Sequence, residues 1–339
     1  MDPFRLEADR VLLLDQTRLP DQETWIEVRN AVEMSDAIAR MRVRGAPAIG
    51  IAAALALGLE EALARGSAAE RIGVLESAGR QLVAARPTAV NLSRAVSRVL
   101  ESARSASADC RAARAEALAL WDEDRAASRA IAEHGANLFP TEVRFLTHCH
   151  TGGLATGGGG TALAIILELS RRRGGTLEVW VTETRPLLQG ARLTAWELRR
   201  EGVPVRLIVD SAAAHTILNR RIEGVLVGAD RIARNGDVAN KIGTLPLALA
   251  AREAGIPFIV AAPWSTVDPS TPSGASIPIE ERDESEVTGV KEVAVAPPGI
   301  RVENPAFDVT PARLVSAITT ERGVRRGPHY DFSRDFSRG

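Results

Sequence analysis

The stretch Arg144 to Thr161, RFLTHCHTGGLATGGGGT, joins a short buried strand to a helix through a glycine-rich loop. The mostly apolar residues 143–146 are enough for one buried strand, and TALAIILELS from Thr161 has the apolar pattern of a helix. Between them, six glycines fall within residues 152–160. Open α/β sheets build ligand sites from a strand, a loop and a helix in this order.

Glycine lets the backbone approach a ligand closely, and bare N–H groups ahead of a helix attract phosphate, so the loop predicts a phosphate site. A flexible connection is the alternative, because the loop fits neither the dinucleotide fingerprint nor the P-loop. The reactive side chains of His148, Cys149 and His150 at the end of the strand favour a site. Successive residues of a strand point to alternate faces, so these three are not expected to converge on one metal ion.

Beyond Val143, apolar strand-like runs alternate with helical runs, which predicts an α/β fold with a parallel sheet and helices on both faces. The strand-like runs are VRFLT (143–147), LEVWVTE (177–183), VPVRLIVD (203–210), GVLVGAD (224–230) and IPFIVAA (256–262). A further strand is predicted near Val293 to Ala296. Thr310-Pro311 is expected to open a last helix, since it matches a helix N-cap followed by proline.

The first part of the chain has a different pattern. Residues 1–35 predict a small antiparallel β piece. A helix is expected from about Met34 with Ser35 as its N-cap, and further helices over residues 67–86, 91–107 and 108–138. The change of pattern predicts two domains, a mainly helical one over residues 1–125 and an α/β catalytic domain over residues 126–339.

Composition excludes several classes of function. The chain has 339 residues, is 45% apolar and carries a net charge of −1, so no global field favours nucleic acid or a membrane. Two cysteines, Cys110 and Cys149, give neither a disulfide framework nor zinc spacing, which suits a reducing cytoplasm. Cys110 is expected to be inert core. No signal peptide is evident, and no apolar run approaches the ~20 residues that span a bilayer.

Polar side chains follow each predicted strand, and ligands bind beyond the carboxyl ends of parallel strands. Asp230 follows the apolar run 225–229, where loss of solvent would raise the pKa of a carboxyl and suit it to general acid–base chemistry. A carboxylate paired with Arg231 or Lys241 is the alternative. Asp210 with Ser211 is most simply a helix cap.

Several long motifs, in one order from about Leu13 to Thr320, resemble the methylthioribose-1-phosphate isomerases, a family grouped with regulatory subunits of the translation-initiation guanine-nucleotide exchange factor. The motifs are RGAPAIG (44–50), RPTAVNL (86–92), ETRPLLQGARLTAWEL (183–198), GADRIARNGDVANKIGT (228–244) and NPAFDVTP (304–311).

The resemblance implies a Rossmann-like C-terminal domain beside a smaller helical N-terminal domain, and a homodimer. It implies an aldose–ketose isomerase of methionine salvage, which converts 5-methylthioribose 1-phosphate to 5-methylthioribulose 1-phosphate without metal or organic cofactor. Cys149 and Asp230 match the family's catalytic pair. The positions matching its phosphate and sugar contacts are Arg44, Gly45, Ala46, Arg86, Gln189, Asn240 and Lys241.

The sequence departs from the family pattern THCNAGALATAGYGTALG in the glycine-rich loop. His150 replaces asparagine and Gly159 replaces tyrosine, which we expect to open space beside the sugar. The 5-substituent therefore stays open between methylthio, hydrogen (5-deoxyribose 1-phosphate) and a second phosphate (ribose 1,5-bisphosphate). A subunit that senses sugar phosphate without catalysis is the alternative from another class. A nicotinamide dehydrogenase would rest only on the strand–helix alternation.

Overall fold

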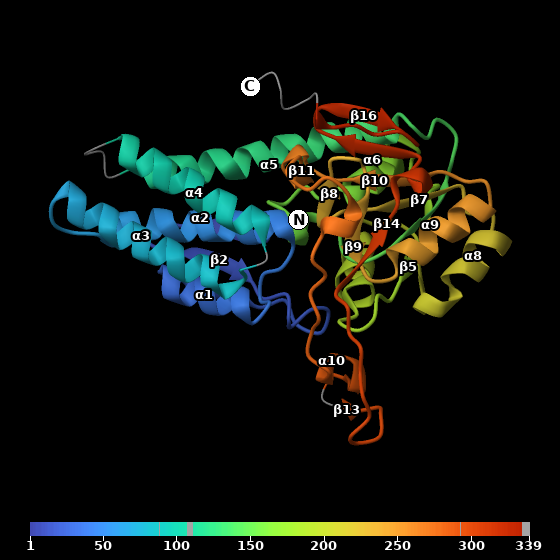
Figure 1. Ribbon diagram of the computed structural model, residues 1–339, viewed down its shortest axis with the longest axis horizontal. Coiled ribbons are helices and arrows are strands. Elements are labelled where there is room, and N and C mark those ends of the chain that lie inside the picture. Colours follow the sequence, from blue (N-terminus) through green and yellow to red (C-terminus); the bar gives the residue numbers. More distant parts are fainter. Residues whose placement is uncertain (88, 107–110, 292, 334–339) are drawn as a thin grey trace. The chain divides into compact units, whose positions relative to one another are not determined.

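The computed structural model describes residues 1–87, 89–106, 111–291 and 293–333, so Cys110 lies outside the described residues. The chain divides into two compact units (Figure 1). The first comprises Met1–Arg129 and Thr151–Gly160, and the second comprises Ala130–His150 and Thr161–Gly339. The glycine-rich loop therefore belongs to the first unit, although the strand and helix that flank it belong to the second.

The first unit starts with the predicted antiparallel piece, a sheet in the order β1-β2-β3, and continues into helices. Its elements are β1 (Phe4–Leu6), β2 (Val11–Leu14), β3 (Trp25–Val28), α1 (Ala31–Ala39), α2 (Ala46–Leu63), α3 (Ala68–Ala85), α4 (Val90–Ser105) and most of α5 (Ala112–Ala136). The predicted helical character of this region is confirmed. Ser67 caps α3 through a reciprocal capping box with Glu70, which fixes where that helix begins.

The predicted start of the first helix is wrong. Asn30, in extended conformation, caps α1 by accepting the Glu33 N–H at 2.9 Å, and the Glu33 carboxylate in turn accepts the Arg29 N–H. The hydroxyl of Ser35 instead donates to the Gln81 carbonyl. Asparagine is as good an N-cap as serine, and here the reciprocal bonds with Glu33 decide between them.

Helix α2 forms the centre of the first unit's core. It begins directly after Gly45, which has φ 102°, and Pro47 lies in its first turn, where proline is compatible with a helix. Length and composition alone would let α2 cross a membrane, but 72% of it is buried inside the fold. An Ala-rich helix of this kind packs closely, and α4 is one of the helices that lie against it.

The second unit contains a seven-stranded sheet in the order β16-β15-β10-β7-β4-β5-β6, parallel throughout except for β16. Its strands are β4 (Arg144–Thr147), β5 (Glu178–Thr182), β6 (Val205–Ile208), β7 (Gly224–Val227), β10 (Phe258–Ala261), β15 (Ala317–Thr320) and β16 (Gly323–Arg326). The main helices between them are α6 (Ala162–Arg172), α7 (Ala195–Arg200), α8 (Ala213–Asn219) and α9 (Thr244–Glu253). The predicted α/β fold with a parallel sheet is confirmed.

A four-stranded sheet and a small projecting hairpin complete the second unit (Figure 1). The sheet has the order β11-β8-β9-β14, with β8 (Arg231–Ala233), β9 (Val238–Lys241), β11 (Val267–Asp268) and β14 (Phe307–Thr310). The hairpin pairs β12 (Gly289–Val290) with β13 (Val293–Ala294) after the short helix α10 (Ser285–Thr288). Strand β13 agrees with the strand predicted near Val293.

The last helix expected after Thr310-Pro311 is wrong. Only a single 3-10 turn, Ala312–Leu314, follows the proline, and the chain then enters β15. All four residues of β15 are buried, parallel to β10 on one side and antiparallel to β16 on the other. Pairing with two strands therefore overrides the local N-cap signal.

Candidate active site

The strand order places a topological switch point between β4 and β7. From β4 the sheet grows through β5 and β6 in one direction, and the chain then returns to β7, β10 and β15 on the other side of β4. Ligands bind at the carboxyl ends of the strands at such a point. Cys149 lies two residues beyond β4 and Asp230 lies three residues beyond β7, so both leave the same edge of the sheet from neighbouring parallel strands.

Cys149 is buried and has left-handed backbone conformation, with φ 62° and 6% of its surface exposed. Non-glycine residues pay roughly 1–3 kcal/mol for that conformation, and such residues cluster at functional sites. Both of its peptide groups are bound by threonines: its N–H donates to Thr184 Oγ1 at 2.9 Å, and Thr194 Oγ1 donates to its carbonyl at 2.6 Å.

The amide of Gln189 contacts the thiol directly. Its Nε2 lies 3.3 Å from Cys149 Sγ, and the side chain is buried. A π-helical turn, Gly190–Thr194, follows it; a Cβ on Gly190 would overlap the Thr182 carbonyl, so only glycine lets this turn lie against β5. Gln189 Oε1 is buried and makes no hydrogen bond to any residue that the structure describes, so it can accept one from a bound hydroxyl.

The two histidines beside Cys149 have different partners. His148 bridges Thr182 Oγ1 at 2.6 Å and the Ile242 carbonyl at 2.9 Å, and its burial lowers its pKa, so it is neutral near pH 7. His150 Nδ1 lies 3.1 Å from Thr194 Oγ1, with Nε2 3.8 Å from the Glu197 carboxylate. Neither geometry assembles a metal site with Cys149.

Asp230 is exposed in the free protein, so the desolvation expected from its buried strand is absent. Its N–H pairs with the Ala239 carbonyl at 3.0 Å, which ties it to β9. Burial raises the pKa of another carboxyl, Asp308, to about 6, although the N–H groups of Leu245 and Gly243 oppose the shift. Asp308 is not among the predicted site residues, and its signal in the sequence is its place in the motif NPAFDVTP.

Asn240 and Lys241 end β9 and are both buried. Asn240 Nδ2 donates to Thr244 Oγ1 at 2.9 Å, and the Lys241 ammonium lies 4.7 Å above the ring of Phe307. Asp308, opposite Asn240 in the strand pairing, accepts the N–H of Gly243 just beyond them. These contacts fix the backbone that carries both side chains.

Asp210 is not the helix cap that its sequence position suggests. Its two carboxylate oxygens accept the N–H groups of Thr184 at 2.8 Å and Arg185 at 2.6 Å, while α8 starts three residues later without a side-chain cap. A carboxylate after β6 thereby holds the loop after β5. Thr184 is itself left-handed, with φ 61°, so the loop after β5 carries strain as the one after β4 does at Cys149.

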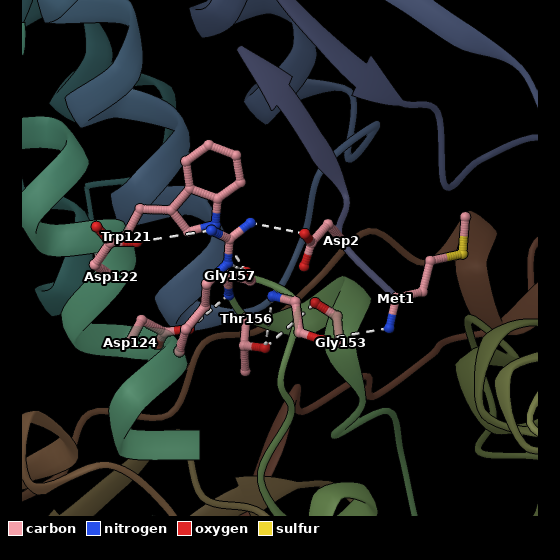
Figure 2. Close-up of polar contacts among 10 residues, drawn as sticks. Met1, Asp2, Trp121, Asp122, Asp124, Gly153, Thr156 and Gly157 are labelled. Atoms are coloured by element: carbon pink, nitrogen blue, oxygen red, sulfur yellow. Dashed lines mark hydrogen bonds and ion pairs between the residues drawn. The ribbon is translucent and has the colours of Figure 1, made fainter. Parts of the chain in front are cut away.

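The glycine-rich loop satisfies its own N–H groups, and the predicted phosphate cradle is wrong for most of it. The N–H groups of Ala155, Thr156, Gly158 and Gly160 donate to atoms of the same loop. That of Gly157 donates to Asp124 Oδ2 at 2.6 Å. Figure 2 shows Trp121 and Asp124 of α5 reaching Gly157, whose carbonyl accepts from Trp121 Nε1 at 2.7 Å. Donors already paired within the protein are not available to an anion.

The space that glycine was expected to open at residue 159 is filled. A Cβ at Gly159 would overlap the buried side chain of Ser128 in α5. A Cβ at Gly157 would lie 2.7 Å from the Trp121 ring and 2.9 Å from Asp124. The glycines therefore let the loop pack closely against α5.

Four sequence-predicted site residues belong to the first unit. Arg44, Gly45 and Ala46 form the entry to α2, and a Cβ on Gly45 would overlap the backbone of Ala155, so this turn needs glycine. Arg86 ends α3, five residues before Asn91, whose carbonyl lies against the first turns of α2 at Gly50. Arg44 thus precedes α2 and Arg86 follows α3, and arginine is well suited to hold phosphate.

Comparison with known proteins supports one family. The Initiation factor 2 subunit family matches residues 42–327 of the chain. A methylthioribose-1-phosphate isomerase of Heliobacterium modesticaldum is 51% identical over 98% of both chains. A 5-deoxyribose 1-phosphate isomerase of Moorella thermoacetica is also 51% identical, over 96% of this chain and 95% of that one.

A solved structure agrees with the sequence relatives. The crystal structure of 5-methylthioribose 1-phosphate isomerase from Pyrococcus horikoshii OT3 is 40% identical and superposes with a TM-score of 0.92. The match covers 99% of this chain and 94% of that one. The chain therefore belongs to the Initiation factor 2 subunit family and, within it, to the methylthioribose-1-phosphate isomerases.

Proposed function

We propose that the protein is an aldose–ketose isomerase that converts 5-methylthioribose 1-phosphate to 5-methylthioribulose 1-phosphate in methionine salvage. Relatives of that activity, similar over nearly the full length, support the reaction. The single observation that carries the site is a buried thiol, Cys149, held against the buried amide of Gln189 at the switch point of the sheet.

The phosphate on carbon 1 prevents the sugar from opening to a free aldehyde, so ring opening needs a proton donor. Asp230 protonates the ring oxygen, and the bond from that oxygen to carbon 1 breaks. Hydrogen then moves from carbon 2 to carbon 1 as a hydride, and the carbon 2 hydroxyl returns its proton to the Asp230 carboxylate. The product is the ketose 1-phosphate, with no net oxidation. Binding of the sugar covers Asp230 and takes its carboxyl out of bulk water.

The remaining predicted residues bind and orient the substrate. Arg44, Arg86 and Lys241 hold the phosphate, with Gly45 and Ala46 offering backbone N–H groups at the start of α2. Gln189 Oε1 accepts a hydrogen bond from a sugar hydroxyl. The Asn240 amide donates one to a sugar hydroxyl. Cys149 stabilises the charge that develops at carbons 1 and 2. In a site from which the sugar excludes water, hydride migration is favoured, since it needs no separate base.

Ketose formation from methylthioribose 1-phosphate, followed by NMR, tests the proposal. Asp230→Asn and Cys149→Ala should each lower kcat by on the order of 10²–10⁴-fold, as loss of an acid–base group does. Turnover of Asp230→Asn equal to the wild type would remove Asp230 from its role. Thermal stabilisation by the substrate without any product would instead favour a sugar-phosphate-sensing subunit.

A second substrate has specific support, because one relative of equal identity is named for 5-deoxyribose 1-phosphate. Comparing kcat/KM for the methylthio, deoxy and 5-phosphate sugars ranks the three 5-substituents. A preference of kcat/KM for the deoxy sugar would change the substrate and leave the reaction unchanged.

A cytoplasmic homodimer is also part of the proposal. Light scattering during size exclusion should give twice the mass of one chain, and a monomer mass at micromolar concentration would contradict it. Cell fractionation tests the compartment that the cysteine content suggests.

A further inference from the structure

We propose that the hydroxyls of Thr184 and Thr194 are positioning groups that lock Cys149 in its left-handed conformation and so aim its thiol at Gln189. The kinetic part of this inference rests on the proposed isomerase function. The structural part does not, because it concerns only where the thiol lies. Neither threonine is among the residues that the sequence motifs single out for substrate or catalysis.

The first lock acts on the peptide before Cys149. Thr184 Oγ1 accepts the Cys149 N–H at 2.9 Å, and its own proton goes to the Thr182 carbonyl at 3.2 Å. Thr184 is fixed in turn, because Asp210 accepts its N–H at 2.8 Å and that of Arg185 at 2.6 Å. A carboxylate from the end of β6 therefore holds the residue that holds the thiol-bearing backbone.

The second lock acts on the peptide after Cys149. Thr194 has one hydroxyl proton, and it goes to the Cys149 carbonyl at 2.6 Å. The contact of 3.1 Å to His150 Nδ1 must then be a hydrogen bond that His150 donates, which fixes the proton on Nδ1. The Glu197 carboxylate lies 3.8 Å from the other ring nitrogen.

A lock is needed because cysteine does not adopt φ 62° without support. Glycine would adopt it freely but would remove the thiol, so the chain keeps the side chain and binds the backbone on both sides instead. Both threonines are fully buried, so water cannot replace a lost hydroxyl. Loss of either bond lets residue 149 relax to negative φ, which swings Sγ away from the Gln189 amide.

The variants Thr184→Val and Thr194→Val keep the branched shape and delete one hydroxyl each. Thr319→Val is the matched control, because Thr319 is equally buried in β15 and its hydroxyl has no hydrogen-bond partner in the described part of the chain. The readout that does not depend on turnover is alkylation of Cys149 by iodoacetamide, measured at that residue by mass spectrometry. Alkylation should become several-fold faster in both lock variants, because the thiol leaves its buried place, and should not change in Thr319→Val.

The kinetic readout separates positioning from binding. We expect kcat to fall on the order of 10²-fold, as for a small misplacement of a reacting group, with little change in KM. Thr184→Ser and Thr194→Ser restore the hydroxyl and should recover both readouts, which also covers the case of a valine variant that does not fold. Alkylation rates equal to the wild type in folded valine variants, or no recovery by serine, would overturn the inference. Absence of turnover in the wild type would overturn the proposed function and leave the alkylation test intact.

Discussion

The backbone of Cys149 carries strain that its neighbours offset. The motif around it predicts a reactive residue at the end of a buried strand. Its conformation depends on Thr184 and Thr194, which lie 35 and 45 positions away, so no local pattern could predict it. The same is true of Asp308, whose environment comes from the start of α9.

Replacing Cys149 by glycine should stabilise the fold relative to replacing it by alanine. Left-handed conformation costs an L-residue ~1–2 kcal/mol, and the greater unfolded-state entropy of glycine offsets part of that gain, so we expect a net ~0.5–1 kcal/mol. Urea denaturation of Cys149→Ala and Cys149→Gly measures the difference. Ala262→Gly is the control: Ala262 is buried beyond β10 with negative φ, so glycine should destabilise there. If Cys149→Ala is more stable than Cys149→Gly, the backbone of residue 149 is not strained.

The raised pKa of Asp308 makes folding depend on pH in a specific window. Its ordinary pKa of 3.8 rises to about 6 on folding, so the folded state binds more protons between these values. The stability that the protonated carboxyl contributes is therefore lost as the pH rises from about 4 to 6, at most ~3 kcal/mol. Plotted against pH across this range, the free energy of unfolding from urea denaturation should fall more steeply in the wild type than in Asp308→Asn.

Asp237 should make the stability depend on pH in the opposite direction from Asp308. Burial favours its neutral form, but hydrogen bonds from the Ala312 and Gly274 N–H groups and the Asn235 amide outweigh burial and lower its pKa. Its contribution to stability is present at neutral pH and is lost as the pH falls through its folded pKa.

If the unfolding free energies of Asp308→Asn and the wild type change with pH in parallel, Asp308 is not the group that makes stability fall between about pH 4 and 6.

At the scale of elements, the strands and most helices were predictable because their apolar periodicity is strong and local. The predictions were wrong where contacts with residues distant in the sequence determine the local structure. Residues 317–320 form a strand because β10 and β16 flank them, and the glycine-rich loop is a packing element because α5 lies against it. Glycine content alone does not distinguish close approach to a ligand from close approach to a helix.

The packing role of the loop predicts opposite effects for two glycine substitutions. Gly159→Ala forces a methyl group into Ser128 and should destabilise the fold by ~1–3 kcal/mol, as overpacking does. Ser128→Gly in the same chain should recover part of that loss. Gly73→Ala, within α3 where a methyl group meets open space, should instead stabilise by up to ~1 kcal/mol. Thermal unfolding measures all three, and a neutral Gly159→Ala would show that residue 159 faces free space after all.

At the scale of the whole molecule, the family was predictable because its motifs run in one order along nearly the full chain. The place of residues 151–160 in the first unit was not predictable, since it depends on contacts between residues that are distant in the sequence. Gln16 donates to the Leu154 carbonyl at 2.8 Å and Trp121 to that of Gly157, so the loop completes the first unit. Both ends of that loop nevertheless continue into the second unit, through β4 and α6.

This connectivity predicts that opening the second unit also releases the loop from the first. Leu226→Ala, at a fully buried position of β7, should cost ~2–5 kcal/mol and speed hydrogen exchange in the sheet. Amides of Thr151–Gly160 should lose protection with it, because the loop keeps its hydrogen bonds only while both of its ends are anchored. Leu249→Ala, at an exposed position of α9 in the same unit, should leave the loop protected. If Leu226→Ala weakens protection in the sheet but not in the loop, the first unit holds the loop by itself and the two units open independently.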